Sequence, residues 1–270
     1  MSSAPPGSAS FRAEDVARLS RSTLRLAFEP GPASPPLEDV AAALARSPTQ
    51  LCAVAGQLPP ARGERLLRLS QRPVADQVRE EARTRLVAGL FWLLVYELRP
   101  ELWDRLARME SISPELLGSL DCTGQLVIEV AAGSGRLSAY LADRAGLLIA
   151  IEPVPSLRLR LHERLGERCC VVAALGYRLP LADGAADLAV SCASFGPDYP
   201  IGGEPVLAEL ERVVRPGGRV AVVGPEKPSW WSGRGYELHS FPPPELEPQP
   251  DLEAFFGPMD PPSELAVKTL

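Results

Sequence analysis

The stretch Leu126-Val-Ile-Glu-Val-Ala-Ala-Gly-Ser-Gly-Arg-Leu137 decides the fold of this chain. Its first five residues are apolar apart from one glutamate, and such a run predicts a buried strand. Small residues follow at 131–135, and apolar residues at helical spacing begin with Leu137. A strand, a glycine loop and a helix N-terminus in this order point backbone N–H groups at a ligand, because glycines leave the approach open.

An acid on the strand, Glu129, narrows the class of ligand. The dinucleotide fingerprint does not call for this acid, and its third glycine would here be Ser138. A carboxylate repels a pyrophosphate and attracts a cation, so a nicotinamide-dependent oxidoreductase is disfavoured. The lysine of a phosphate-binding P-loop is absent as well, which argues against nucleoside triphosphates.

A second acid, Glu152, follows the next predicted strand at 147–151. In this position one carboxylate can hold the paired hydroxyls of a ribose. Two acids on either side of a glycine loop suit a ligand with a positive end and a ribose. S-adenosylmethionine (SAM) is such a ligand.

From about 126 to 223 the chain resembles a class I SAM-dependent methyltransferase, of the group that includes quinone-biosynthesis-type small-molecule enzymes. The matching segments, in order, are 127–136, 151–153, 179–184, 187–191 and 210–218. The resemblance implies a Rossmann-like, doubly wound, mostly parallel α/β sheet with SAM as cofactor. It implies methyl transfer to an oxygen, nitrogen or carbon nucleophile of a small, mostly apolar molecule.

The resemblance also implies a set of cofactor-binding residues. They are Glu129, Ala131, Gly133, Ser134, Gly135, Glu152, Pro153, Leu175, Gly176 and Ser191. Two of these depart from the family pattern. Ala131 stands where the motif usually has its first glycine, and Leu175 stands where many relatives have an aspartate that binds adenine.

No catalytic constellation stands out, and an in-line methyl transfer needs mainly positioning and desolvation, with modest help from a base. His239 is a weak candidate for that base. Phe195 and Tyr199, after the fourth predicted strand, can stack on a substrate or fill the crevice. The five cysteines have no spacing typical of a zinc site, and we expect neither a metal nor disulfides.

Three regions are expected: a disordered segment at 1–10, an all-helical extension at 11–121, and a SAM-binding domain at 122–270 with an irregular proline-rich C-terminal part. Within that part only 236–241 and 263–270 look strand-like, and no helix between strands five and six is visible. The extension can serve as a lid over the site or as a homodimer seam along 90–96. The simplest interpretation of 90–96 is that its inward face is the extension's own core.

Composition excludes several classes of function. The net charge is −6 and the pI is about 5.2, which makes a nucleic-acid partner improbable. The longest apolar run is far shorter than the roughly 20 residues of a membrane helix, and nothing resembles a signal peptide, so we expect a cytoplasmic protein. The alternative to an enzyme is a non-catalytic module with this fold that acts through its helical extension.

Overall fold

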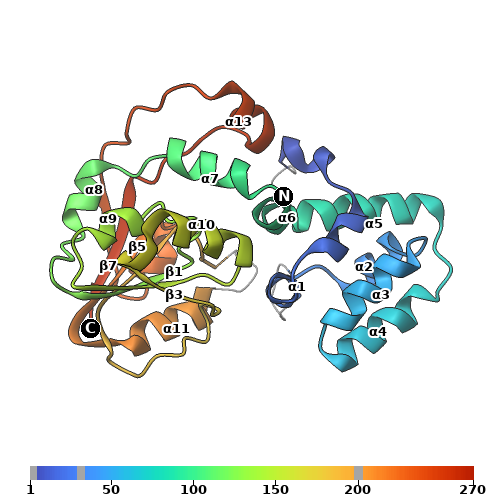
Figure 1. Ribbon diagram of the computed structural model, residues 1–270, viewed down its shortest axis with the longest axis horizontal. Helices are drawn as coiled ribbons and strands as arrows, with labels where there is room; N and C mark the ends of the chain where they lie inside the picture. Colours follow the sequence, from blue (N-terminus) through green and yellow to red (C-terminus); the bar gives the residue numbers. More distant parts are fainter. Residues whose placement is uncertain (1–4, 29–33, 198–202) are drawn as a thin grey trace. The chain divides into compact units, whose positions relative to one another are not determined.

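The computed structural model describes residues 5–28, 34–197 and 203–270 (Figure 1). The chain divides into two compact units: Met1–Leu102 with Gln249–Pro258, and Trp103–Pro248 with Met259–Leu270. This division differs from the expected one at 121/122, because the last helices before the sheet belong to the sheet unit and one C-terminal segment belongs to the helical unit.

The sheet unit contains a seven-stranded sheet in the order β3-β2-β1-β4-β5-β7-β6. The strands are β1 (Leu126–Val130), β2 (Leu147–Ile151), β3 (Cys170–Val172), β4 (Ala186–Cys192), β5 (Val214–Val223), β6 (Glu237–Ser240) and β7 (Glu264–Thr269). The first five strands are parallel, and β7 runs antiparallel to both β5 and β6. This doubly wound sheet confirms the expected fold class, including the final antiparallel pair.

Helices cover both faces of the sheet because successive residues of its buried strands point to opposite sides. On one side, Val127 packs with α8 (Pro114–Ser119), α9 (Ser138–Ala142) and α10 (Pro155–Leu165). On the other side, Ile128 packs with α11 (Gly203–Val213) and α12 (Pro228–Ser232). The short helix α12 corrects the expectation that none lies between strands five and six. Its single turn was not visible in the sequence, and it is anchored by the buried Trp231.

The register of the parallel strands brings their carboxyl ends together. Val130, the last residue of β1, lies opposite Ile151 of β2 and Ser191 of β4. The residues that follow β1, β2 and β4 therefore lie at one edge of the sheet. The chain reverses its direction of winding between β1 and β4, and ligands of open α/β sheets bind at such a point.

The helical unit has its own apolar core. Its elements are η1 (Pro6–Ser10), η2 (Ala13–Arg18), α1 (Arg21–Ala27), α2 (Leu37–Ala43), α3 (Pro48–Gln57), α4 (Pro60–Ser70), α5 (Asp76–Gly89), α6 (Phe91–Leu98) and α13 (Pro250–Phe256). The run 90–96 contributes Leu90, Leu94 and Val95 to the buried residues, whereas Trp92 is 41% exposed. Its inward face is thus the unit's own core.

Residues 6–10 form a 3₁₀ turn rather than the expected disordered segment, and residues 1–4 lie outside the described residues. Gly7 is buried there, and a Cβ on it would lie 2.7 Å from the carbonyl oxygen of Phe255. Only glycine allows this close approach to α13. Phe255 in turn packs edge-on against Phe11 and at a tilt against Phe91, which explains why Gln249–Pro258 belongs to the helical unit.

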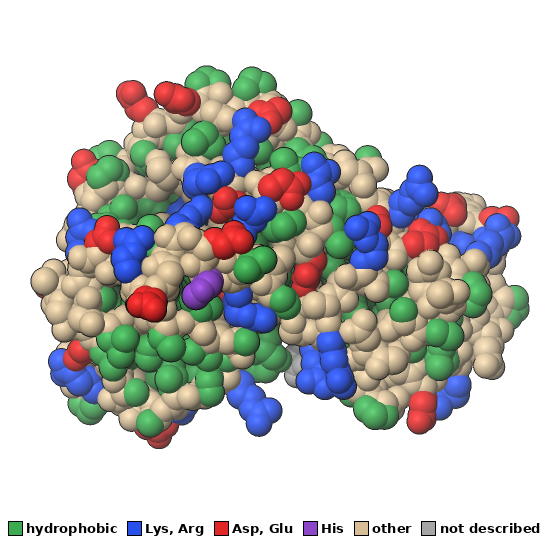
Figure 2. All heavy atoms as spheres, viewed as in Figure 1, with side chains coloured by type: hydrophobic (Ala, Val, Ile, Leu, Met, Phe, Trp, Pro, Cys, Tyr) green, Lys and Arg blue, Asp and Glu red, His purple; other side chains and the backbone are tan. Residues whose placement is uncertain are grey.

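The surface shown in Figure 2 carries acidic and basic side chains interspersed over α10, and hydrophobic side chains gather around the edge strand β3. On this face the described residues form no continuous basic stripe of the kind that binds nucleic acid. Within the described ranges, no helix is both long enough and apolar enough to cross a membrane.

Candidate functional site

The loop after β1 depends on left-handed backbone conformations. The φ angles of Gly133 and Gly135 are +59° and +95°, which glycine adopts at no steric cost. A Cβ on Gly135 would lie 2.8 Å from Leu161 Cδ1 of α10. Ala131 also has a positive φ, +58°, although it carries a Cβ. The alanine that replaces the motif's first glycine is therefore strained, at a cost of about 1–2 kcal/mol.

Glu152 ties the loop to the end of β2. Its Oε2 accepts the Gly133 N–H at 2.8 Å, and its Oε1 accepts the Val154 N–H at 2.8 Å. The Glu152 residue is 3% exposed, so this acid at the end of β2 is buried. Burial raises the pKa of Glu152 to about 7, while the two N–H donors act in the opposite direction. Each oxygen keeps a second lone pair for a ligand.

Glu129 lies beneath the loop and is 1% exposed. Its Oε2 has no hydrogen-bond partner among the described residues. Burial raises the pKa of Glu129 to about 8, and the charge of Glu152 adds to this effect. A buried carboxylate oxygen without a partner is costly unless a ligand satisfies it. The group that would satisfy it is a cation or a hydrogen-bond donor.

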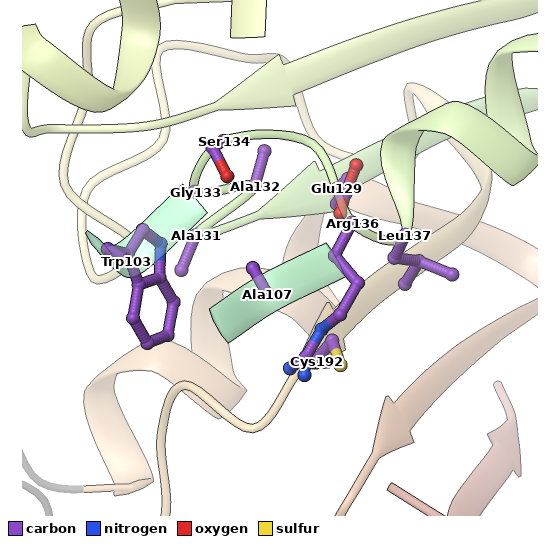
Figure 3. Close-up of a pocket in the computed structure, with 10 residues that line it drawn as sticks. All are labelled: Trp103, Ala107, Glu129, Ala131, Ala132, Gly133, Ser134, Arg136, Leu137 and Cys192. Carbon is purple, nitrogen blue, oxygen red and sulfur yellow. Dashed lines mark hydrogen bonds between the residues drawn. The ribbon is translucent and has the colours of Figure 1, made fainter. Parts of the chain in front are cut away.

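A small cavity lies over this loop (Figure 3). The loop and strand ends line one side with Glu129, Ala131, Ala132, Gly133, Ser134, Arg136, Leu137 and Cys192. The other side is formed by Trp103 and Ala107 of α7 (Pro100–Met109), whose residues from Trp103 on belong to the sheet unit. The remaining volume is only about 30 Å³, room for a water molecule or two.

The part of α7 that belongs to the sheet unit begins at Trp103 and ends at Met109. Residues at or next to both of these ends hold the helix on the loop. Trp103 Nε1 lies 3.5 Å from the point that a Cβ on Gly133 would occupy. Asp104, 5% exposed, pairs with Arg164 of α10 at 2.5 Å. Glu110, directly after the helix, pairs with Arg136 at 2.9 Å. The indole of Trp103 thus covers the glycine loop in this conformation.

Comparison with known proteins assigns this part of the chain. Residues 128–222 match a family model described as a methyltransferase domain. This match agrees with the resemblance of the same segment to class I SAM-dependent methyltransferases. The chain spans about half the length of the curated relatives it matches.

Three proteins illustrate the likeness. A ubiquinone/menaquinone biosynthesis C-methyltransferase of Rubrivivax gelatinosus is 28% identical over 118 residues, which are 44% of this chain and 46% of that protein. An uncharacterised methyltransferase of Synechocystis is 26% identical over 108 residues, 40% of this chain and 50% of that protein. A Haloferax volcanii methyltransferase, solved with the Trm112 activator, has a TM-score of 0.47 at 16% identity and covers 62% of this chain and 91% of its own.

The residues that line the cavity have the chemistry to bind SAM, the cofactor of this class of methyltransferase. The cavity itself is too small to hold it in this conformation. The unpartnered Glu129 Oε2 suits the positive end of the cofactor. Sites for ligands of this size have volumes of roughly 300–1,000 Å³, whereas the cavity under α7 has about 30 Å³. The residues that fit the cofactor are therefore covered by the protein's own helix.

Most other residues implied by the methyltransferase resemblance lie at the same edge of the sheet. Ser191 is fully buried at the end of β4, and its hydroxyl donates to the carbonyl of Val130 at 3.0 Å. Gly176 packs so closely that a Cβ would lie 2.8 Å from Val130 Cγ1. Leu175, half-buried, forms an isolated bridge with Arg178. Pro153 follows Glu152 directly and leads into α10, and Ser134 is buried within the loop.

His239 lies elsewhere. It belongs to the edge strand β6, four places from β1 in the sheet order, which is roughly 19 Å at the usual strand spacing. It lines a separate hollow of about 380 Å³ with Arg219, Phe241 and Leu265. The structure therefore does not bring His239 to the glycine loop, and we do not retain it as a base.

Phe195 and Tyr199, which follow β4, were expected either to stack on a substrate or to fill the crevice. Phe195 is 5% exposed and packs edge-on against Trp231, so it fills the core rather than contacting a substrate. Tyr199 lies outside the described residues.

Two residues of the site escaped the sequence analysis. Arg136 stands within the loop motif, but a motif does not tell where an arginine side chain points. Trp103 was assigned to a separate helical extension, and only the tertiary structure brings it to the loop. The abrupt change from helices to strands after residue 121 masked the fact that α7 belongs to the sheet unit.

Proposed function

We propose that this protein is a SAM-dependent methyltransferase that methylates a small, mostly apolar molecule. The observation that carries the proposal is the buried Glu129 Oε2, which has no partner within the described residues and faces the glycine loop. A cationic ligand explains why an acid is kept there, whereas the pyrophosphate of a dinucleotide would be repelled.

The roles of the residues follow from their positions. Bound SAM supplies an electrophilic methyl group. Glu129 faces its positive end, and the second lone pairs of Glu152 are available to the ribose hydroxyls. Leu137 and Ala107 give the cavity an apolar wall that excludes water and favours an apolar acceptor.

Calorimetry with S-adenosylhomocysteine tests the cofactor, with NAD as the control ligand. We expect binding of the former and none of the latter, and equal binding of NAD contradicts the proposal. Labelled SAM with a panel of small aromatic and quinone-like acceptors then tests the reaction. The acceptor atom follows from the product.

A non-catalytic module is the second candidate, because the covered loop and the strained Ala131 also suit a domain that has lost its ligand. Retention of S-adenosylhomocysteine through purification favours the enzyme. A folded protein that binds neither SAM nor its product favours the module.

Two further expectations remain predictions. Cysteines such as Cys52 and Cys170 are exposed and free, which suits a reducing cytoplasm. A homodimer is to be tested by light scattering of the full chain.

A further inference from the structure

Among the described residues that line the cavity over the glycine loop, Arg136 is the one with a cationic side chain. Its side chain is 14% exposed. One terminal nitrogen donates to the Glu110 carboxylate at 2.9 Å and to the Glu110 carbonyl at 3.1 Å. The other terminal nitrogen donates to Cys192 Sγ at 3.4 Å.

The charge of Arg136 is balanced mainly by Glu110. Burial raises the pKa of the Cys192 thiol, so this group is neutral near pH 7. Burial likewise keeps Glu129 largely protonated near pH 7, because its pKa is about 8. Within the described residues, Glu110 is the carboxylate that bonds Arg136, and it comes from the end of the helix that covers the site.

The cavity is lined both by an acid, Glu129, and by Arg136, whose guanidinium points toward Cys192 (Figure 3). The guanidinium matches the carboxylate of an α-amino acid, and the Glu129 Oε2, which has no partner among the described residues, can accept a hydrogen bond from its ammonium. The methionine end of the cofactor carries both groups. A guanidinium binds a carboxylate more strongly than a neutral donor does, and a planar fork fixes its orientation.

We propose that Arg136 receives the carboxylate of the cofactor and that Glu110 occupies this place while the site is closed. The inference rests on the proposed function. Binding exchanges one carboxylate for another on the same guanidinium, and no covalent bond changes. Once Glu110 is released from Arg136, it leaves the loop together with Trp103, because Trp103 lies in α7 and Glu110 follows the last residue of this helix. Cofactor affinity is therefore set by competition with the protein's own side chains.

Two single variants of the full-length protein give opposite predictions for the dissociation constant of S-adenosylhomocysteine. Glu110→Gln removes the competing charge, and we expect binding to tighten about three- to tenfold. Arg136→Gln removes the guanidinium that receives the carboxylate of the cofactor, and we expect binding to weaken at least about tenfold. If Arg136 serves only to latch α7, its removal should tighten binding, as removal of Glu110 does.

Two controls keep the test sharp. The double variant Glu110→Gln/Arg136→Gln leaves no unpaired buried charge, so it should fold and still bind weakly. Methylthioadenosine lacks the amino-acid end, so Arg136→Gln should not weaken its binding and, because the α7 latch is lost, should bind it at least as tightly as the unaltered protein does. Thermal melting checks the fold of each variant.

The outcomes separate the two proposals. If the unaltered protein binds S-adenosylhomocysteine and Arg136→Gln binds it equally well or better, the role of Arg136 is refuted and the proposed function stands. If every folded variant, including the unaltered protein, fails to bind, the proposed function is refuted and this inference with it.

Discussion

Glu129 and Glu152 are buried side by side under one loop, and both resist ionisation. The pKa of Glu129 is raised to about 8 and that of Glu152 to about 7, chiefly by burial. Such raised values are typical of sites that await a charged ligand. They also make the stability of the free protein depend on pH.

The free energy of unfolding should fall as pH rises from about 5 to 8. In this range the unfolded chain has already released these protons, since its carboxyl pKa is near 4.5, while the folded protein still holds them. The unfolded state then binds fewer protons, so the slope against pH is negative. Each group contributes at most about 1.4 kcal/mol per pH unit. Stabilisation is fully present below pH 4.5 and is lost by about pH 8.

Glu129→Gln should flatten this slope, because a neutral amide replaces one of the two titrating groups. Urea unfolding at several pH values measures it. An identical slope in both proteins would mean that Glu129 ionises normally.

Glu152→Ala should both weaken the cofactor site and destabilise the free protein. Two backbone N–H groups, of Gly133 and Val154, lose their acceptor, which costs about 1–3 kcal/mol. Binding of S-adenosylhomocysteine should weaken by about 1.5–3 kcal/mol through lost charged hydrogen bonds to the ribose. Urea unfolding and calorimetry measure the two effects, with the exposed Glu163→Ala as control. Normal binding would place the ribose elsewhere.

Leu175→Asp should tighten cofactor binding, up to about tenfold, if the residue occupies the adenine position that the resemblance implies. Leu175 is half-buried, so the fold should tolerate the change. Leu175→Ala is the matched control and should not tighten binding. A large drop in melting temperature for Leu175→Asp would show that the position belongs to the core.

Helix α7 determines whether the site is open. Its sequence mixes apolar and charged residues, as expected of a surface helix, and its buried residues include Leu106 and Ala107. The helix is fastened by ion pairs rather than by a large apolar face. Both pairs are largely buried, so the helix can leave the loop only if another charged group replaces the partner that is lost.

Trp103→Ala should increase the affinity for S-adenosylhomocysteine, because the indole that covers Gly133 is removed. Loss of half-buried aromatic surface should lower stability by about 1–2 kcal/mol. Calorimetry measures the affinity, and Trp92→Ala, in the helical unit, controls for loss of a tryptophan. Weaker binding after Trp103→Ala would mean that the indole holds the cofactor instead of excluding it.

The whole chain consists of two units with separate cores, and their roles can be divided by truncation. The sheet unit carries two apolar clusters, one on each face, so it should fold alone. The helical unit includes Gln249–Pro258, so its removal requires deletion of residues 1–98 and replacement of 249–258 by a Gly/Ser linker.

This truncated protein should melt cooperatively and lose methyl transfer, while cofactor binding falls less. The physical reason is that the cofactor residues lie in the sheet unit, whereas we expect the helical unit to serve as a lid for the acceptor. Methylation of the acceptor at the full rate would rule out the lid. If the full-length protein is an oligomer and the same truncation makes it dissociate, the helical unit would instead serve as the homodimer interface.

The sequence by itself determined the sheet and its glycine loop. The run 126–130, the loop glycines and Glu152 all follow from local rules, because β-branched strands and positive φ angles depend on neighbouring residues. These signals placed β1, β2 and the two acids correctly. The missed α12 and the misplaced unit boundary lie where local signals are short or where long-range packing decides.

Only the tertiary structure decided what covers the loop. Trp103, Glu110 and Arg164 are far apart in the sequence, and no periodicity indicates that they meet at the carboxyl ends of the strands. The same holds for the burial of Glu152: local rules placed this acid at the end of a strand, and packing around it decided that it is buried. Burial and pairing depend on the residues that surround a side chain in space, and these surroundings set the pKa values and the access to this site.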